Sequence, residues 1–423
     1  MLNTRRSYAL VAWLLLPMAF LRLLWRSRRQ PAYRQHWGER LGRYAAAPAR
    51  PLIWLHAVSV GETRAAVPLL RQLRERYPDH RLLLTHMTPT GRETARDLID
   101  ADVCRCYLPY DLPFAVTRFL DHFQPRVGVL LETEIWPHLA LACEQHGVPL
   151  LLVNARLSER SAARYARHQP LIRQTLERLA LVAAQSTADA ARFSGLGARD
   201  VRVTGNLKFD MPSPQASEAP ATGLRRLLGE ATRQTWVAAS TRAGEEQLIL
   251  DLWPQLQAPG RLLILVPRHP QRFDEVAALL RKRGIPFVRR SENRPVPPDV
   301  SVLLGDSMGE MQAYYRIADV ALIGGSLLPF GGQNLIEATA VGCPVILGPH
   351  TFNFQEAAVA AVAAGAALRL QDAAELPGTL LPLLEDGGRR QNMGQAGQRF
   401  TLQHQGATRN ILALIDRYIP SGS

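Results

Sequence analysis

From Pro51 onward, short apolar runs alternate with amphipathic stretches. The runs of the first half predict strands at 52–57, 81–85, 127–131, 149–153, 180–184 and 200–204. Helical spacing lies between them, for example in 62–76, where Leu69, Leu70 and Leu73 share one face. Apolar strands that alternate with helices are typical of a parallel sheet covered on both faces, so this half is predicted to have an α/β fold.

A proline-rich segment at 211–222 (MPSPQASEAPAT) interrupts the alternation, and its composition is typical of a linker. After it, strands are predicted at 235–239, 261–266, 286–288, 300–304, 319–323 and 343–347, and a helical end at 388–418. We therefore predict two doubly wound, Rossmann-like domains, at 31–210 and 223–423, that face each other across a cleft. Ligands of such folds bind at the carboxyl ends of the parallel strands, so the loops that follow strands are the candidate sites.

The N-terminus has a different pattern. Ser7 to Leu21 is uncharged and mostly apolar, Arg22 interrupts the run, and further arginines close it after Trp25. The run is shorter than the ~20 residues of a typical span, although a snorkelling Arg22 extends it. A cleaved signal peptide fits poorly, because no small-x-small site follows and the next residues are cationic. We predict an uncleaved membrane anchor with a basic flank over 1–30, either a short span or an interfacial helix, with the body on the cytoplasmic side.

Charge is distributed unevenly along the chain. The 423 residues carry 50 basic and 37 acidic side chains, a formal net charge of +13. Ten arginines and one acid lie in the first 50 residues, which places +9 of this charge at the N-terminus. A basic head on a near-neutral body indicates contact with an anionic membrane surface and argues against a nucleic-acid partner. A composition of 47% apolar and 21% charged residues excludes a disordered chain.

The sequence predicts no metal site. The four cysteines are too few and too scattered for a disulfide framework, and Cys104-x-Cys106 lacks a second ligand pair, so packing is its favoured interpretation. The eleven histidines show no zinc spacing. Asp100-Ala101-Asp102 matches a D-x-D metal motif, but it follows a predicted helix rather than a strand, and we interpret it as a solvated turn.

The loop after the first strand, Ser59-Val60-Gly61-Glu62-Thr63, is the first candidate site. Gly61 allows the backbone to turn tightly, and Glu62 opens the next helix. Two interpretations stay open for this carboxylate. It complements the positive end of the helix, or it acts as a general base that takes a proton from a hydroxyl as a bond forms.

Three later loops of the first domain also carry polar groups. Thr88-Pro89-Thr90-Gly91 caps a helix or touches substrate. The stretch from Glu132 to Pro137 places two carboxylates and a tryptophan after an apolar strand, where they serve either to bind loop amides or to act in catalysis. Lys208, one of only two lysines in the chain, precedes the linker and meets either an anion or an acid such as Asp210.

The second domain repeats this arrangement of loops. Ser240 and Thr241 follow its first strand, and Arg268 follows the next, where its guanidinium suits a phosphate or an acid on a helix. Met308-Gly309-Glu310 follows the strand at 300–304. A glycine-rich stretch through Gly331 and Gly332 then enters a helix, whose start offers N–H groups to a phosphate. Glu337 in this helix is a candidate acceptor for ribose hydroxyls.

Several of these strings together resemble a known family. The two-domain layout resembles the GT-B glycosyltransferase fold. The strings that carry the resemblance are similar to those of the Kdo (3-deoxy-D-manno-octulosonic acid) transferases: WLHAVSVGET (54–63), THMTPTG (85–91), ETEIWP (132–137), GNLKFD (205–210), VPRHP (266–270), DSMGEM (306–311) and GGQNLIEA (331–338). PAYRQHWGERLG (31–42) behind the apolar segment also fits, so the resemblance runs from about residue 8 to the C-terminus.

The resemblance implies an inverting transfer of Kdo from CMP-Kdo to a lipid A precursor, at the cytoplasmic side of a bacterial inner membrane, in lipopolysaccharide core synthesis. It implies that Glu62 is the general base. The implied CMP-binding residues are Pro267, Arg268, Met308, Gly309, Glu310, Asn334, Leu335, Ile336 and Glu337. Further candidate substrate contacts are Ser59, Gly61, Glu132, Lys208, Ser240 and Thr241. No metal or other cofactor is implied, because cationic side chains and a helix start can meet the charge that grows on the departing CMP.

Two alternatives remain at this stage. One is a GT-B enzyme that uses a UDP-sugar, since the residues that would distinguish cytidine from uridine are not legible in the sequence. The other is a membrane-bound protein that binds a nucleotide sugar without turnover, which leaves Glu62 without a role.

Overall fold

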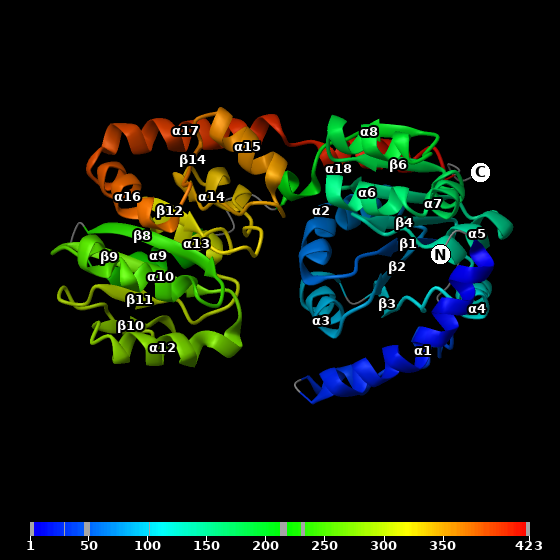
Figure 1. Cartoon of the computed structure of the whole chain (residues 1–423), viewed down its shortest axis with the longest axis horizontal. Coiled ribbons are helices and arrows are strands. Elements are labelled where there is room, and N and C mark those ends of the chain that lie inside the picture. Colours follow the sequence, from blue (N-terminus) through cyan, green and yellow to red (C-terminus); the bar gives the residue numbers. More distant parts are fainter. Residues whose placement is uncertain are drawn as a thin grey trace. The chain divides into compact units, whose positions relative to one another are not determined.

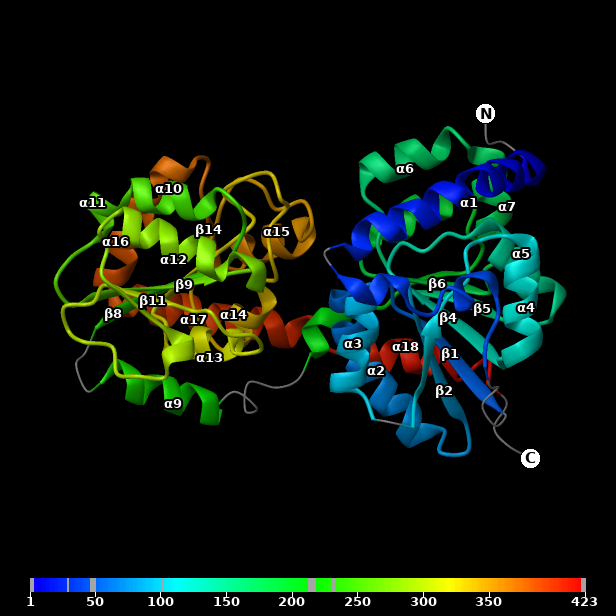
Figure 2. The same cartoon turned by 90° about the horizontal axis from the view of Figure 1, so that it is seen from below.

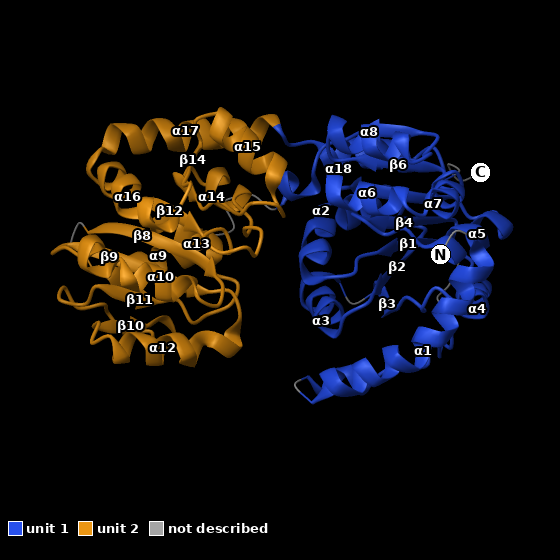
Figure 3. Cartoon of the chain, in the orientation of Figure 1, with its two compact units in different colours: residues 1–211, 404–423 blue, residues 212–403 orange. Residues whose placement is uncertain are grey.

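The computed structural model describes residues 4–28, 30–45, 51–100, 102–211, 218–229 and 233–419. The chain forms two compact units (Figure 3). Unit 1 contains Met1–Met211 together with His404–Ser423, and unit 2 contains Pro212–Gln403.

Unit 1 is built on a seven-stranded sheet in the order β3-β2-β1-β4-β5-β6-β7, and its strand pairs are parallel. Its strands are β1 (Leu52–His56), β2 (Arg81–His86), β3 (Cys104–Tyr107), β4 (Val127–Leu131), β5 (Leu150–Ala155), β6 (Leu181–Ala184) and β7 (Val201–Val203). Its helices are α1 (Arg5–Ser27), α2 (Val60–Arg76), α3 (Pro89–Leu98), α4 (Pro113–Phe123), α5 (Pro137–Gln145), α6 (Glu159–Ala166), α7 (Gln169–Leu176), α8 (Thr187–Gly195) and α18 (Ala407–Ile415). A 3₁₀ turn, η3 (Leu207–Asp210), follows β7.

Alternate residues of the buried strands feed two cores, one on each face of this sheet. Trp54 packs on one face with Phe119 of α4 and with residues of α5 and α7. Ile53 and Leu55 point to the other face, where α2, α3 and α18 close the core with Leu69, Ala95 and Ile411 among others. Strands that are buried on both sides require apolar side chains at successive positions, which is why they are legible as continuous apolar runs.

Unit 2 has a second parallel seven-stranded sheet, in the order β10-β11-β9-β8-β12-β13-β14. Its strands are β8 (Gln234–Thr241), β9 (Arg261–Pro267), β10 (Phe287–Arg289), β11 (Val302–Leu304), β12 (Val320–Ile323), β13 (Val345–Leu347) and β14 (Ala367–Arg369). Its helices are α9 (Glu218–Leu228), α10 (Glu245–Asp251), α11 (Trp253–Leu256), α12 (Phe273–Lys282), α13 (Met311–Ile317), α14 (Ile336–Ala340), α15 (Gln355–Ala363), α16 (Leu376–Glu385) and α17 (Gly387–Gln403) (Figure 1).

The predicted α/β class with two parallel sheets is confirmed, but two edge strands were missed. β3 alternates Cys104 and Cys106 with Arg105, so it presents no continuous apolar run. β14 has only three residues, and Arg369 among them is exposed. Cys106 is buried in the unit 1 core, in agreement with the packing interpretation of the Cys-x-Cys pair.

The C-terminal boundary of the second domain differs from the prediction of 223–423. The predicted helix at 388–418 is interrupted near Gly406, whose φ of 106° is left-handed, and the chain divides into α17 and α18. Ile411 and Ile415 of α18 are buried in unit 1, where they cover one face of the sheet. Within the predicted linker, 212–217 lies outside the described residues, and α9 already begins at Glu218.

The N-terminal helix α1 runs along the outside of unit 1 and bends midway, where Pro17 interrupts its backbone hydrogen bonds (Figure 1 and Figure 2). Among the described residues it is the one helix long and apolar enough to cross a membrane, by length and composition. One side touches the body: Trp13 stacks on Phe114 of α4, with 5.2 Å between ring centroids. The opposite side exposes large apolar residues, namely Leu10, Leu14, Leu15, Met18, Leu21, Leu24 and Trp25.

Gly128 in β4 provides a test of the tight packing in unit 1. A Cβ at this position would come within 2.9 Å of the Trp54 ring and of Leu150. Overpacking of this kind typically costs ~1–3 kcal/mol, so we expect Gly128→Ala to lower the melting temperature. Gly195→Ala is the control, because a Cβ at the end of α8 meets nothing within 4 Å. Equal melting temperatures of the two variants, measured by thermal unfolding, would contradict this packing.

Candidate functional site

Glu62 is held by the first turn of α2. Ser59 caps the helix and accepts a hydrogen bond from the Glu62 amide at 3.4 Å. The Ser59 hydroxyl donates to Glu62 Oε1 at 2.9 Å, and the Val58 amide donates to Oε2 at 2.8 Å. The carboxylate is therefore fixed directly beyond the carboxyl end of β1, beside the exposed Gly61.

The surroundings of Glu62 favour a carboxyl group that titrates near neutral pH. Burial, the largest cause, and the negative charge of Glu132 raise the pKa of Glu62, which lies at about 7. The hydrogen bonds from Val58 and Ser59 act in the opposite direction. Glu62 thus completes a helix start and has a pKa in the range that suits a general base, a role that stays a prediction.

Glu132 is the first residue after β4, the strand that pairs with β1. Its φ of 61° is left-handed, a strained conformation for a residue that is not glycine. Its Oε1 lies 3.0 Å from Lys208 Nζ in a largely buried ion pair. The second acid of this loop, Glu134, accepts a hydrogen bond from the Trp136 indole at 2.5 Å, and burial raises its pKa. The β1 and β4 loops therefore bring three carboxylates to one edge of the sheet.

Lys208 reaches this edge from η3. The Asn206 side chain accepts from the Lys208 amide at 3.0 Å, and Asn154 Oδ1 accepts from the Leu207 amide at 3.0 Å. Of the alternatives from the sequence, the structure contains the ion pair with another acid, Glu132. The nearby Asp210 instead accepts backbone N–H groups of the α18 start.

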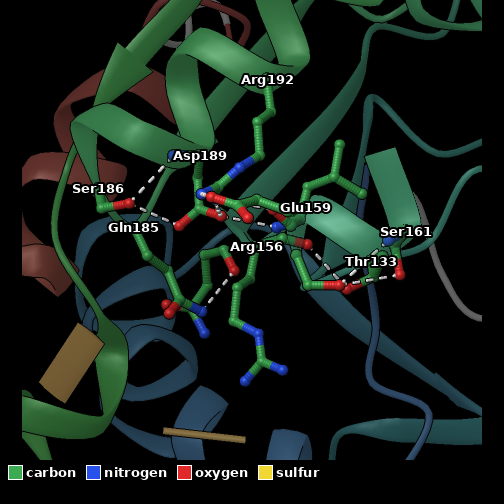
Figure 4. A network of polar contacts seen from close by, with 11 residues as sticks. Thr133, Arg156, Glu159, Ser161, Gln185, Ser186, Asp189 and Arg192 are labelled. Atoms are coloured by element: carbon green, nitrogen blue, oxygen red, sulfur yellow. Dashed lines mark hydrogen bonds and ion pairs between the residues drawn. The ribbon is translucent and has the colours of Figure 1, made fainter. Parts of the chain in front are cut away.

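A polar network fixes the loops that follow β4, β5 and β6 (Figure 4). The Thr133 hydroxyl donates to the Arg156 carbonyl at 3.0 Å, which ties the β4 loop to the β5 loop. Buried Asp189 accepts from the Leu157 amide at 2.7 Å and from the Ser186 hydroxyl at 2.7 Å, which ties β5 to β6. The guanidinium of Arg156 extends away from these contacts (Figure 4). Loops tied to one another hold Glu132 in its strained conformation.

Two buried histidines beneath the Glu62 loop were missed by the sequence analysis. His56 ends β1, with Nδ1 2.8 Å from Thr85 Oγ1, and burial lowers its pKa to about 3. His86 ends β2 and donates from Nδ1 to the Ala57 carbonyl at 2.9 Å, and burial lowers its pKa to about 4. Both rings are therefore neutral supports at neutral pH. The signal in the sequence was a histidine at the end of an otherwise apolar strand.

In unit 2, Arg268 connects three neighbouring loops. It follows Pro267, the last residue of β9, and its amide donates to the Thr241 carbonyl at the end of β8 at 2.9 Å. Its Nε donates to Gln333 Oε1 in the glycine-rich loop at 3.2 Å. Ser240 next to Thr241 has a left-handed φ of 60°. The loops after β8, β9 and β12 thus meet at Arg268, the β8 end through its backbone amide and the glycine-rich loop through its guanidinium.

A buried acid, Glu245, shapes the glycine-rich loop and was also missed. Its carboxylate accepts from the amides of Gly325 at 2.6 Å, Leu327 at 2.9 Å and Arg242 at 2.8 Å. The backbone at Gly324 passes so close to Ser240 that a Cβ would lie 2.6 Å from its carbonyl. The signal for Glu245 was the same as for Glu62, an acid at a helix start after the first strand of its domain.

The segment from Asn334 to Glu337 forms the start of α14. Asn334 donates to Glu337 Oε1 at 3.0 Å and accepts from the Ile336 amide at 3.1 Å. The side chains of Leu335 and Ile336 are buried, so these two residues can offer a ligand only their backbone groups.

The loop after β11 holds the remaining nucleotide-binding candidates. Met308 is 55% exposed, and Gly309 adopts a left-handed φ of 85°. Glu310 pairs with Arg290 at 2.8 Å and accepts from the Ser307 hydroxyl at 2.5 Å. The loop is fixed by contacts within unit 2.

Some side chains named from the sequence are engaged elsewhere. The buried Thr241 hydroxyl donates to Glu246 at 2.6 Å, so a substrate would meet at most the backbone of this residue. Asp100 and Asp102 both pair with Arg74 at the surface, in keeping with a solvated turn. Within the described ranges, no group of three or more His, Cys, Asp or Glu side chains is arranged to hold a metal ion.

Comparison with solved structures identifies the class. A glycosyltransferase from Rickettsia africae matches with a TM-score of 0.60 and 12% identity, over 89% of this chain and 100% of that one. UDP-GlcNAc 2-epimerase from Neisseria meningitidis matches with a TM-score of 0.59 and 15% identity, over 87% of this chain and 100% of that one. Two doubly wound parallel units of this kind define the GT-B fold.

Sequence comparison identifies the family within that class. A family model described as 3-deoxy-D-manno-octulosonic-acid transferase matches residues 35–211, and a model of group 1 glycosyl transferases matches 286–400. The 3-deoxy-D-manno-octulosonic acid transferase of Bordetella pertussis is 45% identical over 90% of both chains. That of Haemophilus influenzae is 39% identical over 95% of both. The chain belongs to the family of 3-deoxy-D-manno-octulosonic acid (Kdo) transferases.

The raised pKa of Glu62 predicts how the stability of the folded protein depends on pH. The carboxyl group titrates at 4.5 when exposed and at about 7 in the fold, so folding favours its protonated form. The resulting contribution to stability is present below pH 4.5 and is lost as the pH rises to about 7. The glutamine of Glu62→Gln does not titrate, so the stability of the variant does not lose this contribution. We therefore expect the melting temperature of the variant to rise relative to that of the wild type as the pH increases. The shift corresponds to on the order of 3 kcal/mol at most. Parallel pH curves of the two melting temperatures would contradict the raised pKa.

Proposed function

We propose that this Kdo transferase moves Kdo from CMP-Kdo to a sugar hydroxyl of a lipid A precursor, with Glu62 as the general base. The observation that carries the proposal is the Glu62 carboxyl group, which is buried, fixed by two hydrogen bonds and has a pKa of about 7. A base that titrates near the working pH is both available in its charged form and able to accept a proton.

The reaction proceeds with inversion at the anomeric carbon of Kdo. Glu62 takes the proton of the acceptor hydroxyl while the acceptor oxygen forms its bond to the anomeric carbon. The bond from that carbon to the phosphate oxygen breaks on the opposite face, and CMP leaves with the electron pair. Negative charge therefore passes from the carboxylate of Glu62 to the departing phosphate.

Cationic groups in each unit meet the negative charge of the substrates. Arg268, held by the carbonyl of Thr241 and the side chain of Gln333, faces the phosphate of CMP, together with the amides at the start of α14. Lys208 binds an anionic oxygen of donor or acceptor next to Glu62, while its ion pair with Glu132 fixes its direction. A fixed ammonium and guanidinium are sufficient for this stabilisation, so we do not invoke a metal.

The contacts of α1 support an acceptor that comes from the membrane. The aromatic rings of Tyr8 and Trp13 pack on His138 and Phe114, which lie at the starts of α5 and α4. Phe20 packs on Tyr110 in the loop after β3. These loops follow β3 and β4, so α1 lies at the same edge of the sheet as Glu62. We propose that α1 lies in the membrane interface, with its exposed apolar side in lipid and unit 1 on the cytoplasmic side.

Substitution of Glu62 distinguishes the binding of CMP from the transfer of Kdo. We expect Glu62→Gln to bind CMP like the wild type and to lose Kdo transfer by about 100- to 10,000-fold, because no group takes the acceptor proton. Transfer is measured by mass spectrometry of a lipid A precursor incubated with the protein, CTP, Kdo and a CMP-Kdo-forming enzyme. Glu75→Gln, an exposed acid on the same helix, is the control.

The wild-type result of this assay also tests the donor. A shift of the lipid by one or more Kdo masses is the expected outcome. No shift with folded protein and intact CMP-Kdo would favour a UDP-sugar donor or binding without turnover. Transfer by Glu62→Gln near the wild-type level would remove Glu62 from the mechanism.

The proposed interfacial position of α1 predicts how the protein is released from membranes. We expect Leu14→Glu with Met18→Glu to reduce flotation of the protein with anionic vesicles, because both side chains lie on the exposed apolar side. Leu98→Glu, which changes an exposed leucine of α3, is the control. Alkaline carbonate extracts an interfacial helix, whereas retention of the wild type in the membrane pellet would indicate a span.

A further inference from the structure

We propose that Asp210 is a positioning residue for the transfer reaction, which acts by holding the turn that carries Lys208 against the start of α18. The proposal rests on the role assigned to Lys208 above. Asp210 itself touches no substrate in this account. Its effect reaches the reaction only through the direction of the Lys208 side chain.

The chain passes between the two units twice, and Asp210 joins the two passages within unit 1. The chain leaves unit 1 after Met211 and returns to it at His404. Asp210 Oδ1 accepts from the Gly406 amide at 2.7 Å, and Oδ2 accepts from the Thr408 amide at 2.5 Å. Residues almost two hundred positions apart in sequence are thus bound by one carboxylate.

Asp210 performs the capping of α18 that this helix cannot supply itself. The N-cap residue is Gly406, which has no side chain to accept the first amides of the helix. These amides have no partner within the helix, and the positive end of the helix dipole lies among them. A carboxylate in this position makes charge-assisted hydrogen bonds, which are stronger than bonds between neutral groups. The connection is therefore stiff as well as specific.

Further contacts of the same two segments surround the carboxylate. The Phe209 ring stacks on His404 with 5.0 Å between ring centroids. Asn410 of α18 donates to the Thr204 carbonyl at 3.3 Å. At Gly205, where φ is 89°, a Cβ would lie 3.5 Å from Ala407. The segment that leads into η3 lies along the first turn of α18, and Asp210 fixes its end.

The turn that Asp210 fixes is short enough to transmit its position to Lys208. η3 has four residues, with Lys208 and Asp210 two positions apart. Its other end is held by Asn154, whose Oδ1 accepts from the Leu207 amide at 3.0 Å. Held at both ends, the turn directs Lys208 Nζ to Glu132, 3.0 Å away. Glu132 in turn acts on the titration of Glu62 through its charge.

The placement of this connection explains why the reaction would depend on it. Met211, where the chain leaves unit 1, directly follows η3, and His404, where it returns, packs on Phe209 of η3. A displacement of the chain at either residue would therefore move the turn. The carboxylate of Asp210 holds the turn to α18, which is itself buried in the core of unit 1. A displacement of about 1 Å in a group that orients substrate can reduce a rate by about 100-fold.

The test compares Asp210→Asn with Asp416→Asn. Asp416 lies at the other end of α18 and binds Arg76 and Tyr77, so its loss weakens the attachment of the same helix without touching η3. We expect Asp210→Asn to lower the kcat for Kdo transfer by about 10- to 100-fold with less than a threefold change in the affinity for CMP. We expect Asp416→Asn to stay within about twofold of the wild type. Equal losses in both variants would overturn the proposal, since they would indicate general destabilisation of α18.

A double-mutant cycle with Lys208→Met tests whether Asp210 acts through Lys208. If it does, adding Asp210→Asn to Lys208→Met lowers kcat by no more than about twofold beyond the single Lys208 variant. Independent, multiplying losses would overturn the proposal and leave the role of Lys208 intact. Full activity of Lys208→Met would overturn the role of Lys208 and the proposal with it, while the Glu62→Gln result would still stand by itself.

A third variant keeps the test decisive if Asp210→Asn fails to fold. Asp210→Glu retains the carboxylate and adds one methylene, so it keeps α18 capped and displaces η3. We expect it to melt close to the wild type and to lose kcat by more than about fivefold. Wild-type kcat in Asp210→Glu, with Lys208→Met inactive, would overturn the proposal.

Discussion

The parallel direction of the paired strands is the constraint on which the rest of this structure depends. Strands that run in one direction end at one edge, so the loop after each strand opens on the same side of its sheet. In unit 1 this edge collects Glu62, Glu132 and Lys208, which are far apart in sequence. In unit 2 the same rule brings Arg268 to the glycine-rich loop. The edge opposite these loops carries none of the candidate residues.

Buried charge at this edge is balanced rather than avoided. Glu62 is held by an amide and a hydroxyl, and Glu132 by the ammonium of Lys208. Burial without these partners would be costly for a carboxylate, and burial with complete pairing would leave it too weak a base. Burial and the charge of Glu132 raise the pKa of Glu62, and its two hydrogen bonds lower it, so that it lies at about 7. Unit 2 uses a similar acid, Glu245, for a different purpose, to hold the glycine-rich loop in shape.

The two ends of the chain show how tertiary packing assigns segments to units. α18 follows the last helix of unit 2 in sequence, yet its apolar side completes the core of unit 1. α1 is apolar enough to cross a membrane, yet rings on one of its sides pack on α4 and α5. The hydropathy of α1 is compatible with a span and with an interfacial helix, whereas these contacts attach one side of the helix to unit 1.

The sequence by itself determined the α/β class, the two sheets, most strands and the loops that bear Glu62 and Arg268. It could do so because strands buried on both faces need continuous apolar runs, and because the loops after parallel strands open at the edge where ligands bind. It did not reveal β3, the neutral supports His56 and His86, or the assignment of α18 to unit 1. These depend on which segments meet in space. The same is true of Lys208, for which the sequence left Asp210 and another acid open as partners. The tertiary structure determines the partner. The carboxylate of Asp210 accepts hydrogen bonds from the first amides of α18, and Lys208 pairs with Glu132.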